Sequence, residues 1–334
     1  MTGVNALFDE VLEKLKKYGS WVILCHENPD GDTLGCAFAL YSFGKREGKR
    51  VSIVSKDTLP EVFSFFPFAD ELLVTKRLAP DEVKEALLIS VDISTEKRAL
   101  ANMPELLSAC ADSVNIDHHG DNTRFAKTNL IVPEASATAE VITALLEAYG
   151  KGISEREASA LYTALVTDNG NFRYNSTSIE SHRCAQILLK SGAKPAEIDD
   201  RINENMTDKI LRLWGLALSR AELFAGGSCA LFWLRGHEID GADADSSALD
   251  GLVNMLMRVK GVKVALFLAE KNGGCKLSVR SRAPYSAREL AAVFGGGGHV
   301  NAAGAKIPGD LDGTLASVKK EAEKYVAFGN PSAQ

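Results

Sequence analysis

The chain has 334 residues, of which 46% are hydrophobic and 25% are charged, and its formal net charge is −6 at pH 7. This length exceeds what one hydrophobic core usually serves, so we expect two domains, and the apolar content suffices for two cores. The negative charge disfavours binding of a long duplex nucleic acid through counterion release. No uninterrupted apolar stretch approaches the ~20 residues that span a bilayer. We therefore expect a cytoplasmic protein without a membrane partner, whose anionic ligands are small.

The cysteines are scattered, without a C-x-x-C pair or any paired spacing. In a chain of this length such a pattern indicates reduced, mostly buried thiols and argues against a disulfide framework or a zinc site. The six residues are Cys25, Cys36, Cys110, Cys184, Cys229 and Cys275.

Strand-like and helix-like segments alternate over the first half of the chain, after an amphipathic helix over residues 1–19. The predicted strands are 21–26, 51–55, 86–92 and 113–119, and the predicted helices are 33–48, 137–150, 154–168 and 178–192. Helices that connect successive strands predict an α/β fold with a doubly wound, mainly parallel sheet.

A polar segment of weak pattern, 191–208, leads into a predicted helix over 207–224, and we place the domain boundary in this region. The pattern then restarts as a smaller α/β domain. Its predicted strands are 228–234, 263–271 and 274–282, its helices 246–261, 286–295 and 311–329, and its glycine-rich loop 295–307. That loop follows a helix, which excludes a Rossmann or P-loop interpretation of the glycines. The expected domains are 1–190, a helical linker over 191–225, and 226–330.

Four clusters of Asp and His each follow an apolar run in the first half. They are His26 with Asp30 and Asp32, then Asp92, then Asp117 with His118 and His119, and finally Asp168. Taken singly, these clusters have ordinary explanations, such as a turn around Gly31 or a helix cap at Asp92. Their repetition at the ends of parallel strands favours one metal site at the carboxyl edge of the sheet.

Oxygen-rich ligand sets with an imidazole and no thiolate suit Mn²⁺ or Mg²⁺ better than Zn²⁺. The number of carboxylates favours two ions that share a bridging residue, and Asp92 is the natural candidate for the bridge. Paired ions polarise a phosphoryl group and generate hydroxide near neutral pH, which suits phosphoester hydrolysis. In a regular strand Asp117, His118 and His119 cannot all bind metal, so one should bind while the others orient it or contact substrate.

These residues resemble the DHH phosphoesterase family of the RecJ-like superfamily over nearly the whole chain. HENPDGDTLG resembles its first motif, Asp92 the second, DHH at 117–119 the third and TDNGNF the fourth, while VRSR and GGGGHVNAAGA resemble the DHH-associated C-terminal domain. Within the family the pattern is similar to stand-alone NrnA-type proteins, which are bifunctional oligoribonucleases (nanoRNases) and 3′-phosphoadenosine 5′-phosphate (pAp) phosphatases.

The resemblance implies a ligand set of two divalent ions, with Mn²⁺ expected and Mg²⁺ as the alternative. One ion would take His26, Asp30 and Asp92, and the other Asp32, Asp92, His118 and Asp168. The resemblance implies three catalytic residues. Asp92 would bridge the two ions, His119 would lie near the scissile phosphate, and Asp117 would orient His119.

The resemblance also implies substrate contacts in both domains, with the active site in the cleft between them. Arg280 and His299 match phosphate- and nucleotide-binding positions, Arg98 and Ser136 match further contacts, and the same C-terminal motifs supply Arg282, Gly297 and Gly298. Two departures are Cys36 in place of a frequent Ser, and Asn169 in place of Thr or Ser. Neither removes a ligand.

The expected activity is Mn²⁺-dependent hydrolysis of short oligoribonucleotides, pAp or both, by a hydroxide that two metal ions activate. One alternative is a cyclic di-AMP or linear dinucleotide phosphodiesterase. Another, from a different class, is a non-catalytic, metal-dependent nucleotide or RNA binder. A processive RecJ-type exonuclease is disfavoured by the length, and a pyrophosphatase by the GGGGH loop. A homodimer remains open.

Overall fold

The computed structural model describes residues 2–203, 206–244, 249, 251–271 and 273–327. The chain divides into two compact units, residues 1–205 and 206–334. The finer boundaries expected at residues 190 and 226 stay predictions, and the end of the second domain, 328–330, lies outside the described residues.

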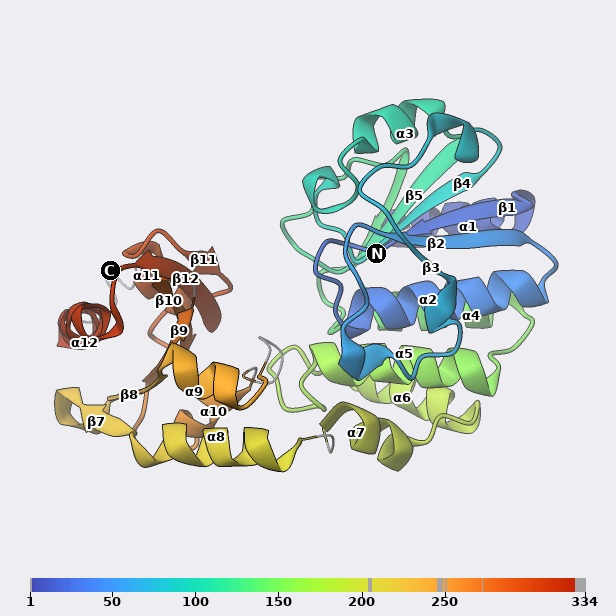
Figure 1. The fold of residues 1–334 in the computed structure, drawn as a ribbon. Helices are drawn as coiled ribbons and strands as arrows, with labels where there is room; N and C mark the ends of the chain where they lie inside the picture. The colour runs from blue at the N-terminus through green and yellow to red at the C-terminus, as the bar shows by residue number, and fades with distance from the viewer. Residues whose placement is uncertain (1, 204–205, 245–248, 250, 272, 328–334) are drawn as a thin grey trace. The chain divides into compact units, whose positions relative to one another are not determined.

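The first unit is built on a six-stranded sheet in which all neighbours are parallel (Figure 1). Its order is β3 (Leu72–Val74), β2 (Arg50–Ser55), β1 (Ser20–Leu24), β4 (Leu87–Val91), β5 (Asp112–Asp117) and β6 (Thr128–Ile131). The chain winds outward in one direction from β1 and in the other from β4. Ligands of open parallel sheets bind beyond the carboxyl ends of the strands at such a reversal point.

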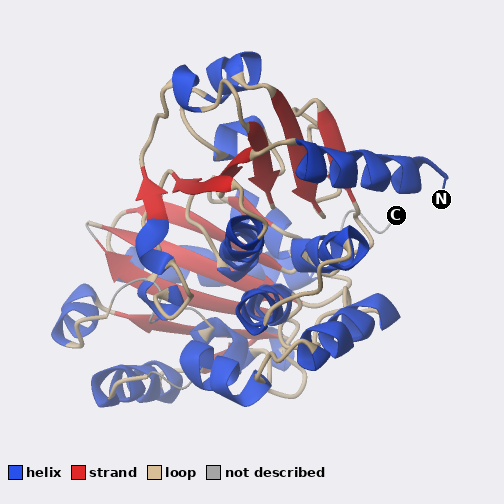
Figure 2. Ribbon diagram, turned by 90° about the vertical axis from the view of Figure 1, so that its right-hand side faces the viewer, coloured by secondary structure: helices blue, strands red, loops and turns tan. Residues whose placement is uncertain are grey.

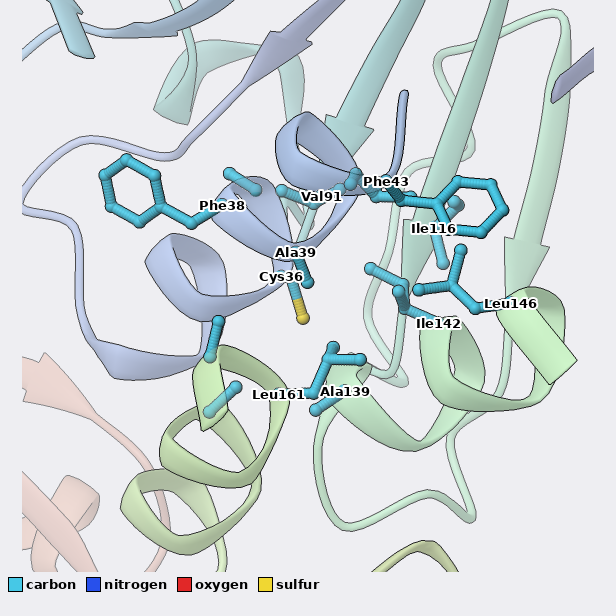
Figure 3. Close-up of a cluster of buried hydrophobic side chains, with 14 of the residues drawn as sticks. Cys36, Phe38, Ala39, Phe43, Val91, Ile116, Ala139, Ile142, Leu146 and Leu161 are labelled. Carbon is cyan, nitrogen blue, oxygen red and sulfur yellow. The ribbon is translucent and has the colours of Figure 1, made fainter. Parts of the chain in front are cut away.

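Helices cover both faces of this sheet, which is why its strands are apolar on both sides. Trp21 and Ile23 face the core shared with α2, whereas Val22 and Leu24 face the core shared with α3. Figure 3 shows Cys36 and Phe43 among the side chains packed in the first of these cores. The helices are α1 (Thr2–Lys17), α2 (Gly31–Arg46), α3 (Met103–Ala109), α4 (Thr138–Tyr149), α5 (Glu155–Asp168), α6 (Ile179–Lys190) and α7 (Pro195–Asn203).

The second unit has a mixed six-stranded sheet, again with helices on both faces (Figure 2). Its order is β11 (Gly297–Gly298), β12 (Ala302–Pro308), β10 (Gly274–Ser281), β9 (Val264–Lys271), β8 (Cys229–Leu234) and β7 (Glu222–Phe224), and only the β8–β9 pair is parallel. The helices are α8 (Asp208–Ser219), α9 (Gly236–Gly241), α10 (Leu252–Leu256), α11 (Ala287–Ala292) and α12 (Leu311–Ala327). Short 3-10 turns complete the two units: η1 (Glu61–Phe63), η2 (Ala69–Glu71), η3 (Pro80–Glu82), η4 (Glu96–Arg98) and η5 (Ala225–Gly227).

The predicted α/β class and doubly wound sheet are confirmed, but several elements differ from the prediction. The helix expected over 207–224 ends at Ser219, and the chain continues as β7. The helix expected over 246–261 is α10, and residues 246–248 and 250 lie outside the described part. The glycine-rich loop expected over 295–307 contains two strands, because its glycines allow close packing: a Cβ on Gly304 would meet the Leu277 carbonyl oxygen at 2.8 Å.

All six cysteines are buried and unpaired, as expected from their spacing. Within the described residues, no helix combines the length and the apolar character that a membrane crossing requires.

Candidate metal centre

The predicted ligands converge at the carboxyl edge of the first sheet. Asp92 follows β4 directly, His118 follows β5 directly, and His26 lies two residues beyond the end of β1. Asp168 is the last residue of α5, and Asp32 lies in the first turn of α2. The alternative of Asp92 as a helix cap is wrong, because η4 starts at Glu96 with Thr95 before it.

The backbone near these side chains has one uncommon conformation and one unusually close approach between helices. Asp92 has a φ of 60°, in the left-handed region that Asp and Asn tolerate better than most residues. Its N–H donates to the Ile116 carbonyl of β5 at 2.9 Å, which ties the residue to the neighbouring strand. A Cβ on Gly31 would lie 2.3 Å from Thr167 Oγ1, so only glycine lets the start of α2 approach the end of α5 this closely. The approach brings Asp32 and Asp168 into one cluster.

The side chains fall into groups whose nitrogen and oxygen atoms lie within 4.8 Å of one another: His26 with Asp30 and Asp92, Asp32 with His118 and Asp168, and Asp92 with His118 and His119. His26 Nε2 lies 3.4 Å from Asp30 Oδ1 and 3.5 Å from Asp92 Oδ2. His118 Nε2 lies 3.3 Å from Asp168 Oδ2 and 3.6 Å from Asp92 Oδ1. Asp92 therefore turns one oxygen to each of two groups.

The tautomers of His26 and His118 indicate which kind of ligand these side chains can bind. His26 Nδ1 lies 2.8 Å from the Glu27 carbonyl oxygen, and His118 Nδ1 lies 3.1 Å from that of Ala135. A carbonyl oxygen only accepts, so each Nδ1 carries the proton and donates it. In a neutral ring, Nε2 then presents a lone pair to carboxylate oxygens that are acceptors themselves. Imidazole nitrogens and carboxylate oxygens that all present lone pairs to one another are stabilised by a cation between them. Histidines that bind metals usually donate their other ring N–H to a carbonyl or a carboxylate, as both rings do here. The residues fit divalent cations.

The pKa values show the same crowding of negative charge. Burial raises the pKa of Asp32 well above its ordinary value, and the charges of Asp92 and Asp168 raise it further. Burial and the nearby Asp92 raise the pKa of Asp168 to about 7, although His118 opposes the shift. Burial lowers the pKa of His26, but hydrogen bonds to Asp30 and Asp92 outweigh this effect and raise it to about 10. Asp32 and Asp168 are therefore difficult to ionise together unless a cation neutralises them.

A second layer of contacts orients His119. Its Nδ1 donates to Asp117 Oδ1 at 2.7 Å, and Asp117 is fully buried. Asn122 Nδ2 donates to Asp117 Oδ2 at 2.5 Å and to the Ile93 carbonyl at 3.0 Å, which fixes the carboxylate. Burial lowers the pKa of His119, but the hydrogen bond to Asp117 outweighs it and the value rises to about 9; the Arg98 charge opposes this rise.

The predicted substrate contacts of the first unit lie in different environments. Arg98 is half-buried at the end of η4, close enough to His119 to act on its pKa. Ser136 is buried; its Oγ donates to Glu140 Oε1 at 2.5 Å and accepts from Ser181 at 2.9 Å. These contacts make Ser136 part of the packing between α4 and α6, and its contact with substrate stays a prediction.

The other predicted contacts belong to the second unit and lie on β10, β11 and the segments beside them. Arg280 Nε donates to Asn254 Oδ1 at 3.1 Å, and Arg282 Nη2 donates to the Met257 carbonyl at 2.6 Å. His299 is exposed and follows Gly297 and Gly298 of β11. Gly298 has a φ of 137°, and a Cβ there would lie 2.7 Å from the Ala302 carbonyl oxygen, so this turn requires glycine.

Several residues that hold the predicted ligands and Asp117 in place were not predicted from the sequence. Asn122 and Thr138 contact Asp117 and Asp92 through side-chain hydrogen bonds, and only folding shows this. The two departures from the family pattern also lie here: Cys36 Sγ donates to Asp32 Oδ1 at 3.3 Å, and Asn169 is buried with its Oδ1 accepting from the Phe172 N–H at 2.8 Å. The signal available in the sequence was only their nearness to the motifs.

The sequence and the structure were compared with known protein families and solved structures. Residues 20–165 match the model of the DHH family, N-terminal domain, and residues 227–327 match that of the DHHA1 domain. The chain is 35% identical over 308 residues to the bifunctional oligoribonuclease and PAP phosphatase NrnA of Thermus thermophilus, covering 92% of this chain and 89% of that protein.

The chain belongs to the DHH family. It is a phosphoesterase of the NrnA type, a hydrolase that acts on phosphoester bonds.

Solved structures share the fold of this DHH-family chain. An exopolyphosphatase-related protein from Bacteroides fragilis superposes with a TM-score of 0.91 at 28% identity, covering 97% of each chain. RecJ of Thermus thermophilus in complex with Mn²⁺ has a TM-score of 0.55 at 16% identity, covering 98% of this chain and 55% of that one, and this likeness concerns the fold.

Proposed function

We propose that this chain is a Mn²⁺-dependent phosphoesterase that hydrolyses short oligoribonucleotides and 3′-phosphoadenosine 5′-phosphate. The observation that carries the proposal is the pair of donor groups that meet at Asp92, one through His26 and Asp30 and the other through His118. The similarity to NrnA of Thermus thermophilus, whose name states both activities, supports this substrate class. The oxygen-rich donor set with imidazoles and no thiolate supports Mn²⁺ or Mg²⁺, and we propose Mn²⁺.

In this proposal the first domain holds two divalent ions. His26, Asp30 and Asp92 would bind one, and Asp32, Asp92, His118 and Asp168 the other. When bound, such ions neutralise phosphoryl charge and lower the pKa of a water molecule toward neutrality. The carbonyls of Glu27 and Ala135 keep both imidazoles in the tautomer that presents Nε2.

His119 would contact the phosphoryl group. Its Nδ1 is engaged by Asp117, so Nε2 is the nitrogen left to donate to a phosphoryl oxygen or to the oxygen that leaves. Asn122 keeps Asp117 in place, and the ring therefore stays in one orientation. Arg98, which acts on His119, adds positive charge for the phosphoryl oxygens.

The second domain would bind the rest of the substrate. Arg280, Arg282 and His299 offer cationic and hydrogen-bonding groups for a terminal phosphate or a nucleotide. Gly297 and Gly298 would lie beside a bound anion. No atom lies within 4 Å of a Cβ placed on Gly297, which leaves room for close approach there, whereas glycine at 298 allows the turn itself.

The test is a substrate panel on the purified full chain, stripped with EDTA and reloaded with Mn²⁺ or Mg²⁺. The substrates are pAp, ribonucleotides of two to five residues with a 5′ label, and cyclic di-AMP. We expect AMP from pAp and mononucleotides from the short RNAs, with no turnover in EDTA. Preferential opening of cyclic di-AMP would instead identify a second-messenger phosphodiesterase. Tight binding without turnover of any substrate would make the protein a nucleotide binder.

A further inference from the structure

Thr138, the first residue of α4, contacts two of the carboxylates of the metal centre. Its Oγ1 donates to Asp92 Oδ1 at 2.9 Å, and its backbone N–H donates to Asp32 Oδ2 at 2.6 Å. The next residue, Ala139, donates its N–H to Asp32 Oδ1 at 3.1 Å. Thr138 is fully buried, so no water competes for these bonds.

These contacts also complete the helix. The residue before α4 is Ala137, which has no side-chain oxygen to accept from the first free N–H groups of the helix. Asp32, which lies 106 residues earlier in the chain, accepts two of them in its place. Both oxygens of Asp32 are thus oriented by the start of α4, where the helix dipole favours a negative charge.

Asp92 needs an orienting contact more than the other ligands do. Its Oδ2 faces His26 and its Oδ1 faces His118, so a rotation of the carboxylate would disturb both donor groups at once. Thr138 Oγ1 is the side-chain donor that holds Oδ1. Partners of metal ligands that fix their orientation typically change metal affinity by about 10–100-fold when they are removed.

We infer that Thr138 is a positioning residue that holds Asp92 and Asp32 in the mutual orientation needed to bind two metal ions. The inference rests on the proposed function, because it assumes that these carboxylates bind metal. The hydroxyl is the part of Thr138 that a substitution can remove, since the backbone N–H remains in every variant.

The experiment measures Mn²⁺ binding by isothermal titration calorimetry, without substrate, for wild type, Thr138→Val and Thr138→Ser. Valine keeps the shape of threonine and removes the hydroxyl, whereas serine keeps the hydroxyl. Thr143→Val is the matched control, because Thr143 is a buried threonine of the same helix whose Oγ1 donates to the Ala139 carbonyl at 2.7 Å. Thermal unfolding in EDTA reports the effect of each variant on the metal-free fold.

We expect Thr138→Val to weaken Mn²⁺ binding about 10-fold or more, while Thr138→Ser and Thr143→Val stay within about threefold of wild type. Wild-type affinity in Thr138→Val, or an equal loss in Thr138→Ser, would overturn the inference. If Thr138→Val does not unfold cooperatively in EDTA, Thr138→Ala takes its place, since it removes the hydroxyl without placing a methyl group against the carboxylate. Failure of the wild type to bind Mn²⁺ would refute the proposed function itself.

Discussion

Replacing Asp92 by Asn should remove most of the stabilisation that Mn²⁺ gives to the first unit. Asn keeps the size of the side chain, tolerates the left-handed backbone at this position and can accept the Thr138 hydrogen bond. It removes the negative charge and replaces one of the two oxygens, which the structure turns toward His26 and His118, by an amide nitrogen that cannot bind a metal ion. The substitution therefore tests the shared ligand without disturbing the fold.

The size of the effect follows from linkage. At a free Mn²⁺ concentration about 100 times the dissociation constant, one bound ion stabilises the folded state by about 2.7 kcal/mol, and two ions by about 5 kcal/mol. All of the predicted ligands lie in the unit of residues 1–205. A unit of that size shifts its Tm by roughly 2–4 °C per kcal/mol, so the wild type should gain roughly 10–20 °C. A 100-fold loss of affinity at each ion would leave a shift of only a few degrees, about 2–3 °C.

The assay is differential scanning calorimetry with EDTA and with saturating Mn²⁺. Asp81→Asn is the matched control, because Asp81 is an exposed carboxylate in η3 and belongs to none of the donor groups. We expect Asp81→Asn to keep the full shift. A Mn²⁺ shift in Asp92→Asn equal to that of the wild type would refute the assignment of Asp92 as the shared ligand.

Three further predictions concern the surrounding structure. Glu157→Ala should lower the free energy of unfolding, measured in urea, by about 3 kcal/mol. The reason is that the buried Glu157 carboxylate accepts from Arg46 at 3.0 Å and from the Ser154 N–H at 2.8 Å. An unchanged free energy of unfolding would contradict this prediction. Asp112→Asn should cost about 1 kcal/mol at pH 7. Burial raises the pKa of Asp112, but the hydrogen bonds from Lys14 and the Ser113 N–H outweigh burial and hold the pKa below 3.8. The stabilisation from the ionised carboxylate is therefore present above about pH 4 and is lost as the pH falls below that value. A stability difference between variant and wild type that persists at pH 2 would contradict this prediction. Gly298→Ala should raise the KM for substrate several-fold and leave the Mn²⁺ shift unchanged, since its Cβ would lie 2.7 Å from the Ala302 carbonyl oxygen in the second unit; a wild-type KM would contradict that role.

The elements that could be predicted are those with strong local patterns. The strands β1 and β4 are largely apolar and buried, and β5 has apolar residues on one face. Carboxylates or imidazoles lie at or just after the ends of all three strands, so both the parallel sheet and the gathering of these side chains at its carboxyl edge could be predicted from the sequence. The edge strands β3 and β6 escaped prediction because they have three and four residues and little pattern. The helix α7 lies in a polar segment, and Ile198 is the single buried residue of this helix, so it gives no periodic signal.

The supporting contacts of the site could not be predicted for a different reason. Asp32 meets the N–H of Thr138 across 106 residues of chain, and no local pattern in ASATAE indicates the partner of that helix start. The left-handed backbone of Asp92 is likewise set by the hydrogen bond to β5 and by the packing around it. Sequence patterns therefore predict which side chains gather at this edge of the sheet, whereas the contacts that orient them depend on the assembled fold.

Electron paramagnetic resonance of the protein titrated with Mn²⁺ would show whether two ions share Asp92. In two-metal sites the ions are typically ~3.5–4 Å apart, so two Mn²⁺ ions that shared Asp92 would be expected to interact magnetically. We predict two bound Mn²⁺ per chain, a broad spin-coupled spectrum in the wild type, and its loss in Asp92→Asn. A single bound ion per chain, or two ions with uncoupled six-line spectra, would show that Asp92 is not shared between two ions.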